Sequence, residues 1–283
     1  MVIDSACALS YGDGNIIVRK DGEYRVPISQ VRNILVNTNS VTVSAALLNA
    51  LSKNNVHSVF CDDRHNPSFE LAPFSNHTEF AGKLMDQCMW NEERKLLVWQ
   101  HIVISKIKNQ RMLLKKLNID SCKSLLEYEQ SVLPGDENNC EAQAARIYFR
   151  ALFGSGFVRH SLDEINSALN YGYILLLNSF NRILSLHGYN TALGIKHCSR
   201  HNRFNLSCDL MEPFRPFVDR TVHDNAEREL DWEYKKLLIE SMQKPVRYGG
   251  REMKLTDACE LYSLDVLKSI SGEEYIVKEI CLD

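Results

Sequence analysis

The spacing of hydrophobic residues differs between the two parts of the chain. Up to residue 72, apolar side chains occur in short runs that are rich in β-branched and aromatic residues. Gly, Pro, Asp and Asn separate these runs, a pattern typical of short strands joined by turns. Asp21 and Gly22 lie between two such runs and predict the turn of a β-hairpin. Residues 43–53 have helical spacing and predict one helix here. The clearest strand-like runs are 16–18, 24–26, 34–36 and 56–61.

From about residue 77 onward, apolar residues recur every three to four positions, which is the period of a helix. The stretch 78–117 contains no Gly or Pro after Gly82 and predicts a long helical run. We therefore expect an α+β fold. A small β-rich N-terminal domain (1–72) and a linker (73–77) precede a larger all-α helical domain (78–283). Further helices are expected at 121–132, 139–153, 162–187, 227–243 and 256–271.

Composition indicates a folded globular protein, because 283 residues with 45% hydrophobic side chains can bury a sizeable core. The formal net charge of −3 argues against a generic polyanion binder, so a nucleic-acid site would have to be a local basic patch. The segment 101–125 is a candidate phosphate-binding strip, although such a run is often only a solvated helix face. Its cations are Lys106, Lys108, Arg111, Lys115, Lys116 and Lys123.

The chain carries few signs of export or of membrane insertion. No apolar run approaches the length that spans a bilayer, and the first residues make a poor signal peptide because Asp4 interrupts them. The nine cysteines are dispersed and include no CxxC pair. We expect a cytoplasmic protein that does not associate with a membrane.

Glu141 is the first residue that suggests chemistry. At 100° per residue it falls on the same helix stripe as Ala145, Tyr148 and Leu152, which places its carboxylate toward the apolar interior. A buried carboxylate needs a partner, and a metal ion is one such partner. The alternative is an acid that only complements the helix dipole in the first turn.

A second polar cluster lies in GIKHCSRHNRFNLSCDLMEPFRPFVD, residues 194–219. Asp209 and Glu212 are three residues apart, so a helix beginning near Ser207 would place both acids on one face. Pro213 should bend or restart that helix because it lacks an amide donor. The neighbouring Asn residues indicate that the histidines before this helix lie in a loop.

One histidine, these two acids and Glu141 would form an oxygen-rich site, which suits Mn²⁺ or Mg²⁺ better than zinc. Residue spacing does not decide between His197 and His201. A zinc site is a second interpretation, although the usual paired spacing of its ligands is missing. A third is a set of buried polar residues that satisfy one another without metal. The four zinc candidates are His197, Cys198, His201 and Cys208.

Cations crowd the same segment. Positive side chains beside a carboxylate and histidine group are what an enzyme acting on phosphodiesters needs, because they can hold the substrate backbone. The candidate DNA-binding residues are Lys196, Arg200, Arg203 and Arg215, with Arg220 close by.

The ordered motifs resemble the Cas1 family of CRISPR-associated integrases and endonucleases, in the form found in type II systems. The resemblance covers nearly the whole chain, and it rests on the order and separation of the motifs. They are LLNALSKNNVHSVFCDDRHNP (47–67), EAQAARIYF (141–149), LFGSGFVR (152–159), INSALNYGY (165–173), LGIKH (193–197) and FNLSCDLMEPFRPFVD (204–219).

The resemblance implies that Glu141, His197 and Glu212 are the catalytic metal ligands, with Asp209 as the acidic neighbour one turn before Glu212. It selects His197 over His201, which spacing alone leaves open. The family usually has Gly after the helix glutamate, where this chain has Ala142. Since Ala is the better helix former, we expect the site to be retained.

The resemblance also implies an activity and partners. A protospacer 3′-hydroxyl would attack a phosphodiester at the edge of a CRISPR repeat in double-stranded DNA, using Mg²⁺ or Mn²⁺. The protein would form a homodimer through its β-rich domain, with Cas2 bridging two dimers and with Cas9 and an accessory adaptation protein as further partners. The alternative is a non-catalytic DNA-binding assembly protein with a structural polar or zinc site.

Overall fold

A computed structural model describes residues 1–63, 67–71, 79–119, 122–272, 274 and 276–281. The chain divides into two compact units, which are described separately below. The first comprises Met1–Phe80 with Ser185–Tyr189, and the second comprises Ala81–Leu184 with Asn190–Asp283. The expected linker, 73–77, and the domain limits at residues 72 and 78 lie outside the described residues. Those boundaries therefore stay predictions.

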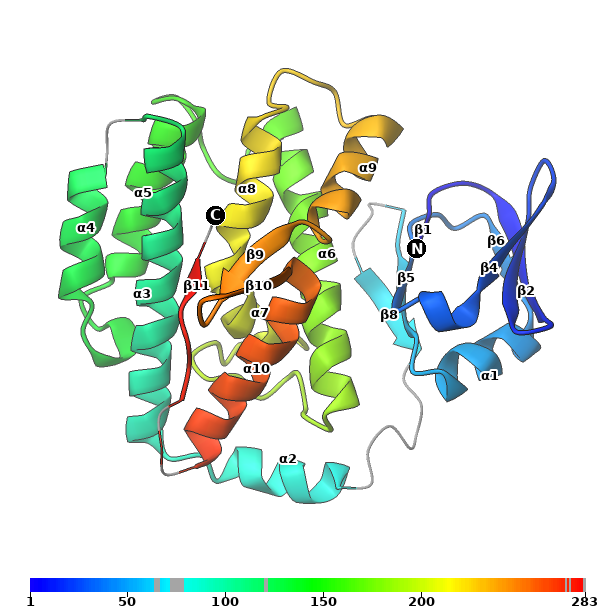
Figure 1. Cartoon of the computed structure of the whole chain (residues 1–283), viewed down its shortest axis with the longest axis horizontal. Coiled ribbons are helices and arrows are strands. Elements are labelled where there is room, and N and C mark those ends of the chain that lie inside the picture. Colours follow the sequence, from blue (N-terminus) through cyan, green and yellow to red (C-terminus); the bar gives the residue numbers. More distant parts are fainter. Residues whose placement is uncertain (64–66, 72–78, 120–121, 273, 275, 282–283) are drawn as a thin grey trace. The chain divides into compact units, whose positions relative to one another are not determined.

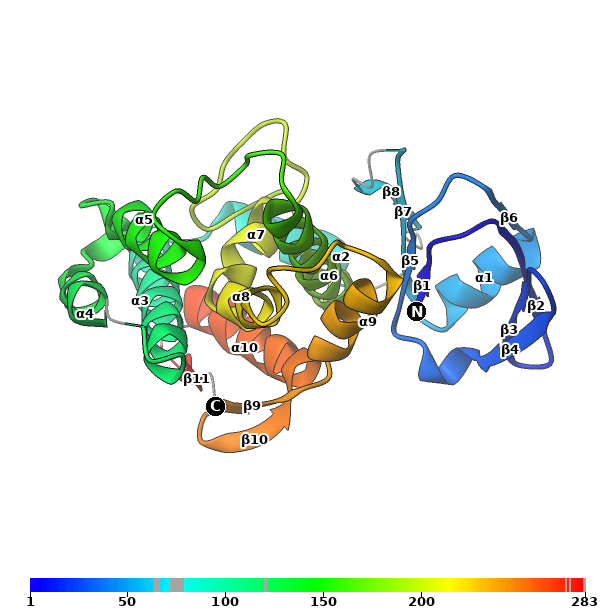
Figure 2. The ribbon, with the colours of Figure 1, turned by 90° about the horizontal axis from the view of Figure 1, so that it is seen from above.

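The N-terminal unit contains two β-sheets with one helix between them. One sheet has the strand order β1-β5-β7-β8, and the other has the order β4-β3-β2-β6. Helix α1 (Ala45–Lys53) lies between the sheets (Figure 2), and its buried Leu47 and Leu51 join residues of both sheets in one apolar core. The strands are β1 (Val2–Ile3), β2 (Cys7–Gly12), β3 (Asn15–Arg19), β4 (Glu23–Pro27), β5 (Asn33–Val36), β6 (Val41–Val43), β7 (His57–Cys61) and β8 (Pro67–Leu71).

The predicted hairpin is confirmed. Strands β3 and β4 pair antiparallel, with Ile17 opposite Arg25, and Asp21 and Gly22 lie in the connection between them. Strands β5 and β7 pair in parallel and are joined through α1, which is the crossover that a parallel pair requires. A 3-10 turn, η1 (Ile28–Gln30), follows β4.

The second unit is mostly helical (Figure 1), which confirms the predicted fold class together with the β-rich first unit. The predicted helical run 78–117 is two helices rather than one. Asn91 interrupts it, since its side chain accepts a hydrogen bond from Arg94 N and caps the second helix. The helices are α2 (Phe80–Cys88), α3 (Glu92–Lys116), α4 (Cys122–Ser131), α5 (Cys140–Phe153), α6 (Glu164–Leu186), α7 (Asn205–Met211), α8 (Arg215–His223), α9 (Trp232–Ser241) and α10 (Leu255–Ser271).

The second unit also contains a small antiparallel sheet that helical periodicity did not predict. Its strand order is β10-β9-β11, from β9 (Pro245–Tyr248), β10 (Arg251–Lys254) and β11 (Ile280–Cys281). Gly249 and Gly250 have φ of 56° and 77° and form the tight turn between β9 and β10. Strands this short carry too few residues to display a period. No helix among the described residues is long and apolar enough to cross a membrane.

Candidate metal centre

The first turn of α5 holds Glu141 in place. Before it, the turn η2 (Pro134–Asp136) brings the Asp136 carboxylate to the helix start. Asp136 accepts hydrogen bonds from Cys140 N at 2.8 Å and from Glu141 N at 3.1 Å, so it satisfies two amides that no helix carbonyl can reach. The buried face of α5 includes Tyr148 and Leu152, and Glu141 lies at its edge with a quarter of its side chain exposed.

The segment 194–219 passes from a loop through three short helical pieces. His197 and His201 lie in the loop, as the Asn residues indicated. Helix α7 ends at Met211, a 3-10 turn η3 (Glu212–Phe214) follows, and α8 begins at Arg215. The break at Pro213 confirms the prediction that this residue restarts the helix.

Asp209 anchors the loop that carries His197. Its fully buried carboxylate accepts hydrogen bonds from the amides of Ile195 (2.6 Å), Lys196 (3.0 Å) and His197 (3.2 Å). It also contacts His197 Nδ1 at 2.5 Å. A single carboxylate on α7 therefore fixes three consecutive backbone positions and one imidazole ring.

Gly194 is needed where this loop passes Asp209. A Cβ atom at Gly194 would lie 2.2 Å from the His197 carbonyl oxygen and 2.8 Å from Asp209 Oδ2. The first of these contacts is with backbone, which cannot turn aside as a flexible side chain can. The loop can therefore adopt this path only with glycine at this position.

Asp209 and Trp99 determine the environment of His197. The hydrogen bond with Asp209 raises the pKa of His197, while partial burial opposes this effect. The ring packs edge-on against Trp99, with ring centroids 5.8 Å apart. With Nδ1 engaged by a carboxylate, Nε2 is the nitrogen left for a ligand, and metal-bound histidines commonly have this arrangement.

Glu141 and Glu212 come together on one ammonium group, that of Lys106 on α3. Lys106 Nζ lies 2.6 Å from Glu141 Oε1 and 2.5 Å from Glu212 Oε2. Both Lys106 and Glu212 are buried. Arg215 also holds Glu212, since its Nε and Nη2 each lie 2.9 Å from Glu212 Oε1.

These ion pairs set the protonation states. Burial would raise the pKa of Glu212, but the positive charges of Arg215 and Lys106 outweigh it and lower this pKa to about 2. Burial would lower the pKa of Lys106, but the charges of Glu212 and Glu141 outweigh it and raise this pKa. Near neutral pH, Glu212 is thus a carboxylate and Lys106 an ammonium.

The donor set fits a divalent cation. The two carboxylates already converge on one positive charge, that of Lys106 Nζ. Glu212 Oε2 is buried and accepts no aligned hydrogen bond within the described part of the chain, despite its short contact with Lys106. Carboxylate oxygens with one imidazole suit Mg²⁺ or Mn²⁺.

In the described residues, no three His, Cys, Asp or Glu side chains are arranged to hold a metal ion as they stand. The four zinc candidates thus form no ready cluster either. Cys198 and His201 are exposed, and Cys208 Sγ accepts a hydrogen bond from Asn202 Nδ2 at 3.5 Å.

A further buried acid, Asp219 on α8, lies in a hydrogen-bond network beside the site. It accepts hydrogen bonds from Tyr148 Oη at 2.8 Å and from Tyr173 Oη at 2.5 Å. Burial raises the pKa of Asp219 to about 6, although the two tyrosine hydrogen bonds oppose this shift. The Arg215 guanidinium lies over the Tyr173 ring, 4.5 Å from its centroid. This network holds the arginine that pairs with Glu212.

The candidate DNA-binding cations are not equivalent. Lys196, Arg200 and Arg203 are exposed on the His197 loop and its continuation, and Lys196 Nζ donates to the Gly135 carbonyl at 2.9 Å. Arg215 is mostly buried and engaged by Glu212. The structure thus places three of the four at the surface and one inside the site.

The cations of the 101–125 strip likewise include some that are engaged by acids and some that are exposed. Lys106 points into the site, Lys108 pairs with Glu279, and Arg111 pairs with Glu129 at 2.7 Å. Lys115 and Lys116 are exposed at the end of α3. The part at residues 120–121 lies outside the described residues.

Sequence reasoning missed Lys106, which it counted as part of a surface strip. A signal was present, because Lys106 follows Trp99, Ile102 and Val103 at helical spacing and precedes Gln110 and Leu113 on the same buried stripe. A lysine on an apolar stripe requires a buried anion.

Most of the chain matches a known protein family. Residues 1–231 match the family described as CRISPR associated protein Cas1. The CRISPR-associated endonuclease Cas1 of Neisseria meningitidis serogroup C is 35% identical over 224 residues, which cover 78% of this chain and 74% of that protein.

Solved structures share the fold at lower sequence identity. A casposase bound to integration product has a TM-score of 0.81 and 18% identity, over 96% of this chain and 90% of that one. A Cas1 protein from Thermotoga maritima has a TM-score of 0.78 and 17% identity, over 96% of this chain and 97% of that one. A chain of a Cas6-RT-Cas1–Cas2 complex has a TM-score of 0.75 and 20% identity, over 98% of this chain and 36% of that one. At these identities the likeness is one of fold.

Proposed function

Because the chain belongs to the CRISPR-associated Cas1 family, we propose that it is a divalent-metal-dependent DNA integrase and endonuclease of CRISPR adaptation. The observation that carries the proposal is the convergence of Glu141 and Glu212 on a single cation position. These acids come from α5 and η3, which are far apart in sequence. Mutual repulsion would separate two such carboxylates unless a positive charge lay between them.

Glu141, Glu212 and His197 Nε2 would hold Mg²⁺ or Mn²⁺. Such an ion, when bound, polarises the reacting phosphate and lowers the pKa of the attacking or leaving oxygen. Asp209 fixes the tautomer and direction of the imidazole, and Arg215 fixes the Glu212 carboxylate. The exposed Lys196, Arg200 and Arg203 would hold the DNA backbone through its phosphates and so orient it.

The reaction would be a transesterification. The 3′-oxygen of a protospacer end would form a bond to a repeat phosphorus, and the bond from that phosphorus to the repeat's own 3′-oxygen would break. The attacking hydroxyl would give up its proton and the departing 3′-oxygen would take one up, so one 3′-hydroxyl replaces another. One phosphodiester forms for each one that breaks, so no nucleotide is consumed. With water as the nucleophile, the same site would hydrolyse DNA.

The partners would be double-stranded DNA from protospacer and repeat, a second copy of the chain, and Cas2 between two dimers. The Cas2 proposal is supported by the neighbour that is a Cas6-RT-Cas1–Cas2 complex. Cas9 and an accessory adaptation protein are proposed from the type II resemblance alone.

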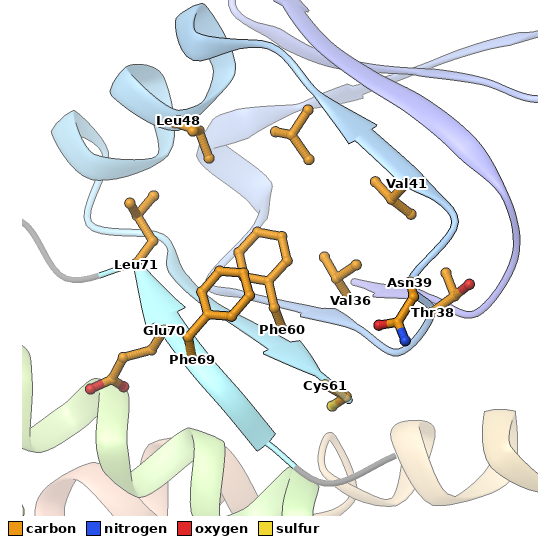
Figure 3. Close-up of a pocket in the computed structure, with 11 residues that line it drawn as sticks. Val36, Thr38, Asn39, Val41, Leu48, Phe60, Cys61, Phe69, Glu70 and Leu71 are labelled. Carbon is orange, nitrogen blue, oxygen red and sulfur yellow. The ribbon is translucent and has the colours of Figure 1, made fainter. Parts of the chain in front are cut away.

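The homodimer would form through the β-rich unit, which has an apolar surface suited to a contact. Phe69 on β8 is 57% exposed and stacks on Phe60 with ring centroids 4.5 Å apart. Both rings line a pocket of about 400 Å³ with Val36, Val41 and Leu71 (Figure 3).

The test is strand joining by purified protein. With Mn²⁺ or Mg²⁺, it should join a DNA fragment to a repeat-containing plasmid. Glu141→Ala or His197→Ala should abolish joining. Thermal unfolding should show that both variants are still folded at the assay temperature. His201→Ala, on the same loop, is the matched control and should keep most of the activity. Undiminished joining by Glu141→Ala or His197→Ala would remove the site assignment.

A second function, that of a non-catalytic DNA-binding assembly protein, is favoured by one observation. The Lys106 ammonium and the Arg215 guanidinium neutralise both acids without any metal. Metal titration separates the two functions. Absence of any Mn²⁺ binding, with retained binding to branched DNA, would favour the assembly role.

A further inference from the structure

Lys106 occupies the centre of the candidate site. It is 8% exposed, and α3 fixes its position because Trp99, Ile102 and Leu113 on the same face are buried in the core of the second unit. Its ammonium has a carboxylate oxygen on two sides, at 2.6 Å and 2.5 Å. Opposite charges at such distances attract strongly where water is largely excluded.

The four groups linked through Lys106 and its ion pairs balance in charge, and the other nearby acid, Asp209, is paired with His197. Glu141 and Glu212 carry two negative charges, and Lys106 and Arg215 carry two positive ones. A divalent cation added between the carboxylates would leave an excess of positive charge in a largely buried place, which is strongly unfavourable. Lys106 Nζ and the ion would also need the same oxygen atoms.

We propose that Lys106 is an internal competitor of the metal ion. In the metal-free protein its ammonium bridges Glu141 and Glu212 and stabilises the fold, and metal binding requires it to leave this bridge. This inference rests on the proposed function, because it concerns the same metal site. It assigns to Lys106 a role opposite to that of a residue which positions the ligands, since removing Lys106 should strengthen metal binding.

When the Lys106 ammonium leaves the bridge, it would move toward the side of Glu141. The Glu141 side chain is 25% exposed and that of Glu212 only 5%, so the bridge opens to solvent at Glu141. An ammonium displaced in that direction needs a new anion, and a DNA phosphate supplies one. Metal and DNA should therefore bind with positive coupling in the wild type, and the coupling should weaken without Lys106.

The experiment measures Mn²⁺ binding by calorimetry to the full chain, with no other metal present. Lys106→Met removes the charge and keeps the length of the side chain. We expect it to bind Mn²⁺ with a Kd lower by roughly tenfold or more, and we expect its metal-free form to unfold at a lower temperature. Lys106→Gln is the second variant, in case Lys106→Met does not fold. Lys236→Met, at an exposed lysine of α9, is the matched control and should leave both quantities unchanged.

An unchanged or weaker Mn²⁺ affinity in the folded Lys106 variants would overturn the competition. If wild type and variants all bind no Mn²⁺, the metal site of the proposed function itself fails. Repeating the titration with a branched DNA tests the coupling. DNA should lower the Kd of the wild type for Mn²⁺ more than that of Lys106→Met, and an equal effect on both proteins would overturn the coupling.

Discussion

Asp209 and Gly194 show how single residues determine the site. The Asp209 carboxylate receives three amides and one imidazole, and Gly194 gives the loop room to reach it. Sequence spacing placed Asp209 near Glu212 but did not indicate which histidine it would meet. Only the family resemblance selected His197. A contact between a loop and a helix depends on the path of the loop, which has no periodicity to reveal it.

Gly194→Ala should displace this loop. The added Cβ would overlap the His197 carbonyl, so we expect a loss of about 1–3 kcal/mol in the free energy of unfolding and roughly tenfold or greater loss of strand joining. Urea unfolding and the joining assay measure the two effects. Gly82→Ala is the control, because its Cβ would meet no atom within 4 Å and alanine favours the helix. Wild-type joining by Gly194→Ala would contradict the role given to the loop.

Asp219 should make stability depend on pH. Burial raises its pKa to about 6 in the folded protein, from an ordinary value of 3.8. The folded state therefore holds its proton more tightly, and the stability that Asp219 contributes falls as pH rises from about 4 to 6. Relative to Asp219→Asn, the wild type should gain about 1.4 kcal/mol between pH 7.5 and pH 5. Urea unfolding of both proteins at both pH values checks this, and an equal difference at the two would refute it.

At the scale of elements, the sequence predicted most helices and strands because their periods are local. It did not predict the break at Asn91, since a cap depends on one side chain rather than on a pattern. It also missed the sheet of β9, β10 and β11, whose strands are too short to show alternation. Lys106 was missed as a site residue because its partners come from α5 and η3, and only the packing of these elements on α3 reveals the pairing.

The start of α5 offers a test at this scale. Asp136→Ala removes the acceptor of the Cys140 and Glu141 amides, which should lower the free energy of unfolding by about 1 kcal/mol. It should also reduce joining, because the turn that carries Glu141 loses its support. Glu137→Ala changes an exposed neighbour and should stay within a few tenths of a kcal/mol of the wild type. Chemical denaturation of the wild type and the two variants measures these free energies of unfolding. Equal stability of all three proteins would contradict the capping role of Asp136.

For the whole molecule, the family match confirms the prediction of the Cas1 family. The sequence could predict the family because the motifs are spread over both parts of the chain. The α+β class is also confirmed, and it could be predicted because the change of hydrophobic period extends along the whole chain. The metal, the homodimer and the DNA partners depend on other molecules and stay proposals. The central claim among them is that Glu141, His197 and Glu212 bind one divalent ion.

Anomalous diffraction from crystals grown with Mn²⁺ tests this claim most directly. We predict one strong manganese peak in contact with carboxylate oxygens of Glu141 and Glu212 and with His197 Nε2, with Lys106 Nζ moved off its bridge. Crystals of Glu141→Ala should lack this peak under the same conditions. A site without manganese between these residues in the wild type, or a peak at Cys198 and His201 instead, would contradict the account.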